Sequence, residues 1–516
     1  MTASKKRVHV PLNRAEGDLE IQVEVADGVI VDAWSSGTMF RGFENMMKGR
    51  GALDGLVLTP RICGICCLTH LTAAVEALDA ITGVRPPDNA RRLRNLALMV
   101  ETVQSDIRHG VLMFMVDFAN RQAYHDHPLI DEAVARYAPL AGKATIQTIR
   151  ETKRLLEVVA IIGGQWPHTS FMVPGGVTSS LDVSETLQCR MTVNHFLSWY
   201  ERSILGCSIE RWREVTSGVE LEKWLDEEVA HRESEIGFFL RFARLAGLDT
   251  MGRGHDRFLS YGNFTLPQDT VVQGTDGRLT AAGFAEGIDI VPFEPEKIRE
   301  DLSHSWYEGT GPAAHPFAGE TRPYASGEGG GLYSWVKAPR YDGLAVETGP
   351  LAERIMDRDP LFLDLVKPHG PNVLIRELAR LTRPAHLLPV MSVWLEELQQ
   401  NRGAAFYHKV ETIPDGEGAG LIQAARGALG HWVRVVDEKI SHYQIITPSA
   451  WHGSPRDRDG GRGAWEEALI GTPIRDETNP VEAGHVVRSF DPCLVCAVHT
   501  VRRGKKRGRL RLGFGR

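Results

Sequence analysis

Apolar and polar residues alternate near the start of the chain, in the segment LEIQVEVADGVIVDAW from Leu19 to Trp34. Alternation with a period of two places every second side chain on one face, as in a half-buried β-strand. The Asp27-Gly28 pair in the middle of the segment is a sequence that favours a two-residue hairpin turn. We therefore predict a pair of antiparallel strands within an N-terminal β region of about residues 7–35.

Helical spacing replaces this alternation after Pro87. Apolar residues then recur at steps of three and four, which predicts a long and largely buried helix; they are Leu93, Leu96, Met99, Val103, Ile107, Val111 and Met115. Residues 143–163 and 183–217 show similar patterns, whereas the glycine-rich segments 321–335 and 448–465 are expected to be loops. The predicted fold is mainly α with a small N-terminal β-sheet, an α+β protein with a large helical-bundle core.

The chain shows no internal repeat and no clear linker. We expect a single large domain over residues 1–499, with the helical core at about 87–440 and a C-terminal segment at about 441–499. The remaining residues, 500–516, form a basic C-terminal peptide.

Composition and charge exclude some classes of protein. The 516 residues have the composition of an ordinary globular protein, and their formal net charge is −7. The last 17 residues hold eight Lys or Arg and no acid. The rest of the chain therefore has 51 basic and 66 acidic residues. Such a tail is typical of a solvated or nucleic-acid-binding arm. The acidic body, however, argues against a nucleic-acid-binding protein as a whole.

The N-terminus, MTASKKRVHVPLN, has charge but no apolar stretch behind it. No signal peptide is visible on this chain, and no apolar run is long enough to cross a bilayer. We therefore expect a cytoplasmic location or one at the cytoplasmic face of a membrane.

Five of the seven cysteines lie in two short motifs. TPRICGICCLTH holds Cys63, Cys66 and Cys67, and SFDPCLVCAVHT holds Cys493 and Cys496. Two Cys-x-x-Cys units can place four thiolates around one metal ion. The other two cysteines, at positions 189 and 207, are most simply buried small hydrophobic residues.

A structural zinc ion is one interpretation of the two motifs. Ordinary zinc ribbons keep their cysteine pairs within a few tens of residues, whereas these pairs are separated by almost the whole chain. Structural zinc also stabilises small modules that lack a core, which is not the case for a chain of this length. Soft thiolates suit several metals, so spacing alone leaves the metal open.

Further motifs accompany the cysteines in order along the chain: NRAEGDLEI, FRGFE, YSWVKAPRY, ETGPLAERI, AARGALGHWV and ITPSAWHGSPRD. With these motifs the chain resembles the large, catalytic subunit of the [NiFe]-hydrogenases over essentially its whole length. The motif style is closest to the uptake and hydrogen-sensing branches. The related subunit of respiratory NADH:quinone oxidoreductases is the nearest competitor, but it lacks the four metal-binding cysteines.

The resemblance implies reversible heterolytic cleavage of H2 to protons and electrons, working in H2 oxidation. That reaction needs a soft metal with an open coordination position and a nearby base. By position in the motifs, Cys63 and Cys493 are expected to be terminal nickel ligands. Cys66 and Cys496 are expected to bridge nickel to an iron ion that carries carbon monoxide and cyanide. Cys493 also matches the usual first proton acceptor.

Other site residues follow from the same resemblance. Glu16 matches the glutamate that passes protons away from the metals, and the following Asp18 stands where a histidine is commoner. Arg426 matches an arginine suspended over the metals, which donates hydrogen bonds and sharpens the local field. Ser449 matches a hydroxyl donor to cyanide. Ala425 replaces the proline that usually precedes the arginine.

Two acids and a histidine are expected to support this centre. Asp117 is predicted to pair with Arg426, and Asp491 matches a second acid above the metals. His70 matches a hydrogen-bond donor to a bridging sulfur, a kind of contact that tunes metal sites. Cys67 departs from the family pattern. We interpret it as a thiol packed behind the site, the alternative being an oxidation-sensitive neighbour of the cluster.

A second metal and a processing step complete the expectations. Glu44 and His499 match ligands of a separate Mg²⁺ (or Fe²⁺) site near the C-terminus, where carboxylate oxygen suits magnesium. In the family, a precursor peptide after the last motif histidine is removed by a maturation endopeptidase once nickel-insertion factors have acted. Residues 500–516 have that position, so the mature catalytic domain is expected to end at His499.

The chain has no further cysteine clusters for iron–sulfur centres. Electrons from a buried site therefore require a small iron–sulfur subunit, and a higher oligomer of such heterodimers is expected. No nucleic-acid partner is expected. The alternatives are an H2-sensing regulatory subunit that turns over slowly, and a non-catalytic scaffold subunit stapled by zinc.

Overall fold

The computed structural model describes residues 6–10, 12, 14–15, 17, 19–309, 311–324 and 331–493. Four predicted features lie outside these residues: Glu16, Cys496, His499 and the basic peptide 500–516. In the described part of the chain, no helix combines the length and the apolar character needed to cross a bilayer.

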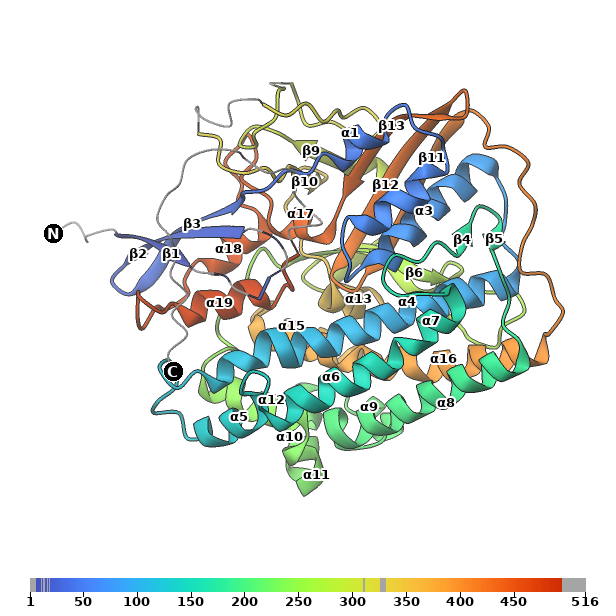
Figure 1. The fold of residues 1–516 in the computed structure, drawn as a ribbon. Coiled ribbons are helices and arrows are strands. Elements are labelled where there is room, and N and C mark those ends of the chain that lie inside the picture. Colours follow the sequence, from blue (N-terminus) through green and yellow to red (C-terminus); the bar gives the residue numbers. More distant parts are fainter. Residues whose placement is uncertain are drawn as a thin grey trace, which may run out of the picture.

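The N-terminal sheet confirms the predicted hairpin. Strands β1 (Lys6–Val10), β2 (Leu19–Ala26) and β3 (Val29–Gly37) pair antiparallel in that order (Figure 1). Ala26 pairs with Val29 across a two-residue loop. Asp27 and Gly28 both have positive φ, 51° and 77°, which is the conformation that the Asp-Gly sequence favours in a twisted hairpin.

A layer of long helices forms the lower half of the molecule in Figure 1. Helix α4 (Asp88–Arg108) is the predicted buried helix. It continues as a π-helical turn over His109–Phe114 and a 3-10 turn over Met115–Ala119. The neighbouring helices are α6 (Lys143–Leu155), α7 (Glu157–Gly163), α8 (Val183–Trp199), α15 (Val373–Thr382) and α16 (Pro384–Gln400).

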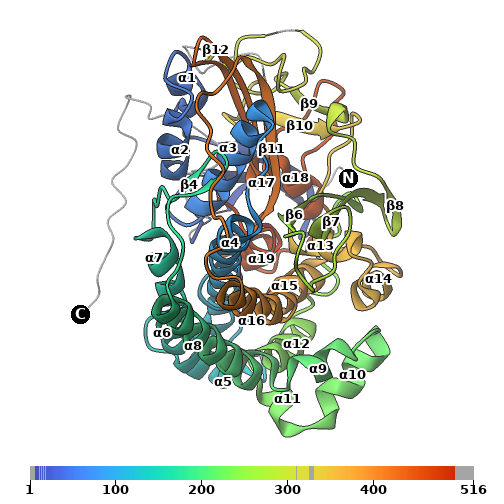
Figure 2. The same cartoon turned by 90° about the vertical axis from the view of Figure 1, so that its right-hand side faces the viewer.

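A second three-stranded sheet stands above this layer. It consists of β11 (Gly416–Ala424), β12 (Gly427–Val436) and β13 (Lys439–Ile446). Helix α3 (Cys67–Thr82) packs directly on it (Figures 1 and 2). A Cβ atom on Gly420 would lie 1.8 Å from the backbone oxygen of Ala73. Glycine therefore permits the close approach of α3 to the sheet.

The region expected to be a helical core thus contains strands as well. Besides β11–β13 it holds β6 (Arg257–Thr265), β7 (Arg278–Glu286), β8 (Asp289–Val291), β9 (Ile298–Asp301) and β10 (Ala338–Tyr341). β6 is buried on both faces, so its sequence lacks the alternation that identifies a half-buried strand. The fold remains the predicted helix-rich α+β class.

The remaining elements are short. They are α1 (Phe43–Met47), α2 (Asp54–Leu58), α5 (Ile130–Tyr137), β4 (Met172–Val173), β5 (Gly176–Val177), α9 (Ile209–Arg213), α10 (Gly218–Glu227), α11 (Val229–Glu233), α12 (Glu235–Leu245), α13 (Pro350–Met356), α14 (Pro360–Val366), α17 (Pro448–His452), α18 (Ala464–Leu469) and α19 (Val481–Arg488).

Candidate metal centre

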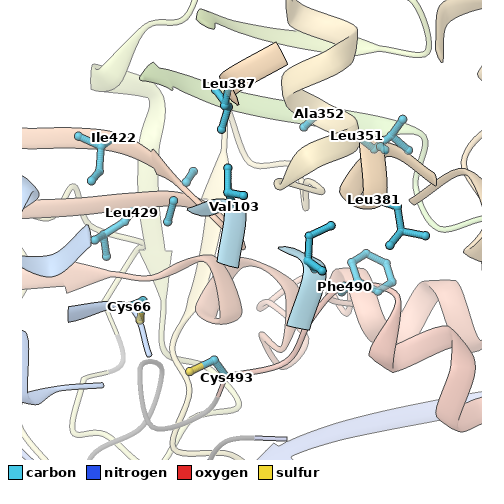
Figure 3. Packing of buried hydrophobic residues seen from close by; sticks show 14 of the residues in the cluster. Cys66, Val103, Leu351, Ala352, Leu381, Leu387, Ile422, Leu429, Phe490 and Cys493 are labelled. Carbon is cyan, nitrogen blue, oxygen red and sulfur yellow. The ribbon is translucent and has the colours of Figure 1, made fainter. Parts of the chain in front are cut away.

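Three buried thiols converge where the start of α3 meets the segment after α19. The Sγ atoms of Cys63, Cys66 and Cys493 all lie within 4.8 Å of one another. The Sγ atoms of Cys63 and Cys493 are 3.7 Å apart. None of the three residues is more than 7% exposed, and Figure 3 shows Cys66 and Cys493 near each other at the edge of the apolar packing. The structure thus brings together residues that are 430 positions apart.

Local structure fixes each thiol. Cys63 and Cys66 occupy the short loop between the 3-10 turn Thr59–Arg61 and α3. Cys493 follows Asp491, whose φ of 56° turns the chain towards the site. The backbone N–H of Cys493 donates to Oγ of Ser449 at 2.9 Å. Because this hydroxyl oxygen accepts from the backbone, its own hydrogen can be donated to another group.

Arg426 provides the positive charge next to the sulfurs. It lies in the two-residue loop of the β11–β12 hairpin, between the paired residues Ala424 and Gly427. Burial opposes its charge, but Asp491 and the three thiols hold the pKa of the guanidinium well above its usual value. Nη1 of Arg426 is buried and has no hydrogen-bond partner among the described residues. A buried N–H without a partner is costly, so this donor points to a group that completes the site.

Arg383 and Asp106 hold the loop that contains Arg426 in place. Ala425, which stands where the family usually has proline, is 2% exposed. Its carbonyl accepts from Nη2 of Arg383 at 2.7 Å, and Arg383 also forms two bonds of 2.8 and 2.6 Å to Asp106. This bidentate ion pair keeps the loop in place without the proline.

Asp491 is the acid that pairs with Arg426. Its Oδ1 lies 3.0 Å from Nε of Arg426 and 3.0 Å from Nδ1 of His109. Nε2 of His109 lies 3.1 Å from Oε1 of Glu377. Burial alone would raise the pKa of Asp491, but Arg426 and His109 hold it far below its usual value. No sequence signal distinguished His109 or Glu377 from other polar residues on buried helices.

The predicted pairing of Asp117 with Arg426 is wrong. The Asp117 carboxylate accepts from Arg14 through Oδ1 and from Arg488 through Oδ2, the latter at 2.5 Å. The prediction rested on the position of Asp117 in the motif of the family that the chain resembles. In the structure the backbone widens to a π-helical turn at His109 and then tightens to a 3-10 turn, which rotates Asp117 away from the direction that a regular α-helix gives.

A small cavity lies beside Cys66. Its volume is about 10 Å³, which is close to the room that one water-sized group needs. The lining residues are Cys66, Thr69, His70, Ala424, Arg426, Leu429, Pro448 and Ser449. The wall is therefore mostly apolar and carries the guanidinium, hydroxyl and imidazole groups expected around the centre.

Glu44 lies in a separate buried polar cluster. Its Oε1 accepts from the backbone N–H of Ile445 at 2.9 Å, and its Oε2 lies 3.4 Å from Nζ of Lys337 and accepts from Thr321. Lys337 also lies 3.4 Å from Glu300. Of the predicted ligands of the second metal, the structure describes Glu44 alone.

Cys67 is a protonated thiol packed behind the site. Its Sγ donates to Oε2 of Glu101 at 3.5 Å and accepts from the backbone N–H of His168 at 3.4 Å. Burial, followed by the charge of Glu101, raises the pKa of this thiol strongly. The carboxylate of Glu101 also accepts from the backbone N–H groups of Leu68 and Thr69, both at 2.8 Å. Glu101, which the sequence did not single out, therefore caps the N-terminus of α3 next to Cys66.

Glu101 should make stability depend on pH. Burial raises its pKa to about 7 from 4.5. The folded state then holds a proton that the unfolded state releases above about pH 4.5, so this contribution is complete below pH 4.5 and is lost as the pH rises to about 7. We expect the unfolding free energy of the natural protein, relative to Glu101→Gln, to fall by about 3 kcal/mol across this window. Thermal midpoints measured from pH 4.5 to 7.5 test this.

Glu157→Gln is the matched control, because Glu157 is an exposed glutamate in the first turn of α7. Its midpoint should follow that of the natural protein at every pH. A difference between Glu101→Gln and the natural protein that stays constant with pH would contradict the assignment.

Comparison with known proteins places this geometry in context. The sequence model of the family described as nickel-dependent hydrogenase matches residues 41–128 and 238–499. The periplasmic [NiFeSe] hydrogenase large subunit of Desulfomicrobium baculatum is 34% identical over 529 residues, which cover 95% of this chain and 94% of that protein. The uptake hydrogenase large subunit of Rhodobacter capsulatus is 28% identical over 586 residues, covering 97% and 96%.

Solved structures agree with these relatives. The structure of the Dm. baculatum [NiFeSe]-hydrogenase superposes with a TM-score of 0.80 at 30% identity, covering 96% of this chain and 100% of that chain. The Ni-Fe-Se hydrogenase of D. vulgaris Hildenborough in the reduced state gives 0.80 at 29% identity with the same coverage. The resemblance stated from the sequence motifs is confirmed.

The expectation of a cytoplasmic location is wrong. The relative that is 34% identical over nearly the whole chain is named as a periplasmic protein. The expectation rested on the lack of a visible signal peptide. That reasoning fails because a partner subunit can carry the export signal for both chains.

Proposed function

The chain belongs to the nickel-dependent hydrogenase family and is a hydrogenase large subunit, and from that premise we propose that it oxidises H2 at a nickel–iron centre held by Cys63, Cys66, Cys493 and Cys496. The observation that carries the proposal is the convergence of three buried Sγ atoms within 4.8 Å. The buried Nη1 of Arg426, which has no partner among the described residues, supports a further group at this place.

The residues present fit such a centre. Thiolates are the soft ligands that nickel and iron accept, and the three described thiols are buried. Cys63 and Cys493 would hold nickel, and Cys66 and Cys496 would hold nickel together with iron. When bound, the two metals supply the soft Lewis acid that polarises H2. Selenium appears in the names of the Dm. baculatum and D. vulgaris proteins, whereas this chain has cysteine at all four positions.

The chain's own groups then handle the proton. Sγ of Cys493 receives the first proton, because it would be a thiolate when bound to nickel and it lies beside the Arg426 guanidinium, which stabilises its charge. Glu16 then accepts the proton and passes it outward. Asp491 holds Arg426 in place through the 3.0 Å ion pair, so the guanidinium keeps its orientation while charge at Cys493 changes.

The side chains around the small cavity beside Cys66 are of the kinds that suit the diatomic ligands of the iron. The hydroxyl of Ser449 and the guanidinium of Arg426 can donate to cyanide, and the walls formed by Leu429 and Pro448 suit carbon monoxide.

The second metal, the partner and the processing step are part of the proposal. Glu44 and His499 hold Mg²⁺ or Fe²⁺, for which a buried carboxylate oxygen is a suitable ligand. Residues 1–499 act as a single catalytic domain, which the continuous buried core from β1 to Cys493 supports. A small iron–sulfur subunit receives the electrons, heterodimers assemble further, and an endopeptidase removes residues 500–516 after nickel insertion. The name of the Dm. baculatum relative supports a periplasmic location.

Counting metals tests the proposal. We expect one nickel and at least one iron per chain, without zinc, in protein purified from a host that has the maturation machinery. The intact mass of the same sample should correspond to residues 1–499. Zinc alone would favour the zinc-stapled scaffold, and a slow enzyme that binds a kinase-type partner would favour the H2 sensor. Nickel-loaded, active protein that retains residues 500–516 would refute the processing step.

A further inference from the structure

Three buried side chains form a hydrogen-bonded row behind the candidate metal centre. Nδ1 of His70 lies 3.1 Å from Nε2 of His431, and Nδ1 of His431 lies 2.8 Å from the hydroxyl oxygen of Tyr443. None of the three residues is more than 1% exposed. His70 also lines the small cavity together with Cys66, so the row leads from the sulfur ligands into the sheet.

The fold places the three residues from three elements. His70 lies in α3 one helical turn after Cys66, His431 lies in β12, and Tyr443 lies in β13. The strand register pairs Tyr443 with Val433, two residues after His431, so His431 and Tyr443 are diagonal neighbours on one face of the sheet. That face is the one α3 covers, because His70 contacts His431.

Each contact in the row needs one donor and one acceptor. Two orders of donors and acceptors are possible along the row. In the first order, Tyr443 donates to Nδ1 of His431, Nε2 of His431 donates to Nδ1 of His70, and the hydrogen of His70 is on Nε2. In the second order every bond is reversed. His70 then carries its hydrogen on Nδ1, and the hydroxyl hydrogen of Tyr443 must find a different acceptor.

The hydroxyl of Tyr443 decides between the two orders. Within the described part of the chain, the hydroxyl of Tyr443 has His431 as its hydrogen-bond partner and no second acceptor. A buried hydroxyl hydrogen without an acceptor is costly enough to favour the first order by about tenfold or more. Both rings are buried, and burial disfavours the charged form of an imidazole. Both rings are therefore neutral and carry one hydrogen each.

We propose that Tyr443 is a positioning residue that sets the tautomer of His70 through His431, so that His70 presents Nε2–H towards the sulfur ligands. Nδ1 of His70 is occupied by His431, which leaves Nε2 as the nitrogen available to the centre. A hydrogen bond from this N–H withdraws charge from a ligating sulfur, as partners behind metal ligands commonly do. The inference deepens the proposed function and rests on it for the identity of the sulfur acceptor.

The variant Tyr443→Phe tests the proposal, because it removes the hydroxyl and keeps the ring. Nδ1 of His431 then lacks a partner in either order, so the preference for the first order that the Tyr443 hydroxyl provides is removed and the population of the second order rises. ¹⁵N NMR of histidine-labelled mature protein reports which ring nitrogen carries hydrogen, and a His70→Asn variant identifies the His70 signal. We expect hydrogen on Nε2 in the natural protein and a mixture in Tyr443→Phe.

A second readout comes from the iron. Each infrared band of its carbon monoxide and cyanide ligands should split into two in Tyr443→Phe, and H2 oxidation should fall by up to about twofold, in proportion to the fraction with the wrong tautomer. The matched control is Tyr200→Phe, because the buried hydroxyl of Tyr200 donates to the backbone oxygen of Leu381 at 2.9 Å, away from the row. This control should leave the tautomer and the bands unchanged.

Two results would overturn the proposal. One is hydrogen on Nδ1 of His70 in the natural protein, a measurement that does not depend on the folding of any variant. The other is an unchanged His70 signal in folded Tyr443→Phe. The tautomer measurement does not require nickel. If the natural protein lacked nickel and iron, the proposed function would be refuted. The position of the hydrogen on His70 would still test this inference.

Discussion

Replacing Cys493 with serine should remove nickel from the protein and abolish H2 oxidation. The Sγ atom lies 3.7 Å from that of Cys63, and it is assigned both as a ligand and as the first proton acceptor. A serine hydroxyl is a hard and weakly acidic ligand that binds nickel poorly. We expect activity to fall by at least about 10³-fold, within the range for a lost acid–base group. Activity and nickel per chain are measured on the same sample.

Cys207→Ser is the matched control for this variant. Cys207 is a half-buried cysteine whose sulfur accepts from Nε1 of Trp224 at 3.4 Å, a bond that a serine oxygen can keep. Its nickel content and activity should equal those of the natural protein. Full nickel occupancy in Cys493→Ser would show that Cys493 is not a ligand, and unchanged activity would also exclude it as the proton acceptor.

Replacing Arg426 with lysine should reduce turnover while leaving the metals in place. Lysine keeps the positive charge but lacks the planar set of N–H donors. The buried Nη1, which has no partner among the described residues, is the donor that would be lost. We expect kcat to fall by about 10²–10³-fold, as when one preorganised donor is removed from an active site. The infrared bands of the iron ligands should also shift.

The control for this second variant is Arg92→Lys. Arg92 is a fully buried arginine that pairs with Glu397 at 2.9 Å, far along α4 from the centre. The Arg92→Lys variant shows how much stability an arginine-to-lysine change in the interior costs. Its kcat should be unchanged. If Arg426→Lys lost nickel in proportion to its activity, Arg426 would be a structural support of the centre and not a donor in turnover.

Local sequence was sufficient for the elements that depend on neighbouring residues. The β2–β3 hairpin follows from alternation around Asp27-Gly28, whose positive φ values need that pair. Helix α4 follows from apolar residues that recur at steps of three and four. The strands β6 and β12 were missed because they are buried on both faces, which removes the period of two that identifies a strand.

The partners of the buried charges could not be obtained in the same way. Asp117 and Asp491 were both expected near Arg426, and only the fold shows that Asp491 pairs with it while Asp117 pairs with Arg14 and Arg488. Glu101 and His109 carry no motif, yet one caps the helix that begins after Cys66 and the other holds Asp491. Changes from α- to π- and 3-10 geometry within one helix also redirect side chains in a way that spacing does not reveal.

The sequence by itself determined which residues are able to bind the metals, because cysteine pairs and their flanking motifs are local patterns of residue type. It also determined the family. The tertiary structure alone decided that Cys63 and Cys493 meet across 430 positions, that Arg426 lies beside them, and that Tyr443 stands behind His70. These relations depend on the packing of α3 against β11–β13. Packing brings together residues that are far apart in the chain, and in a water-free interior such contacts determine the charge, hydrogen position and orientation of each group.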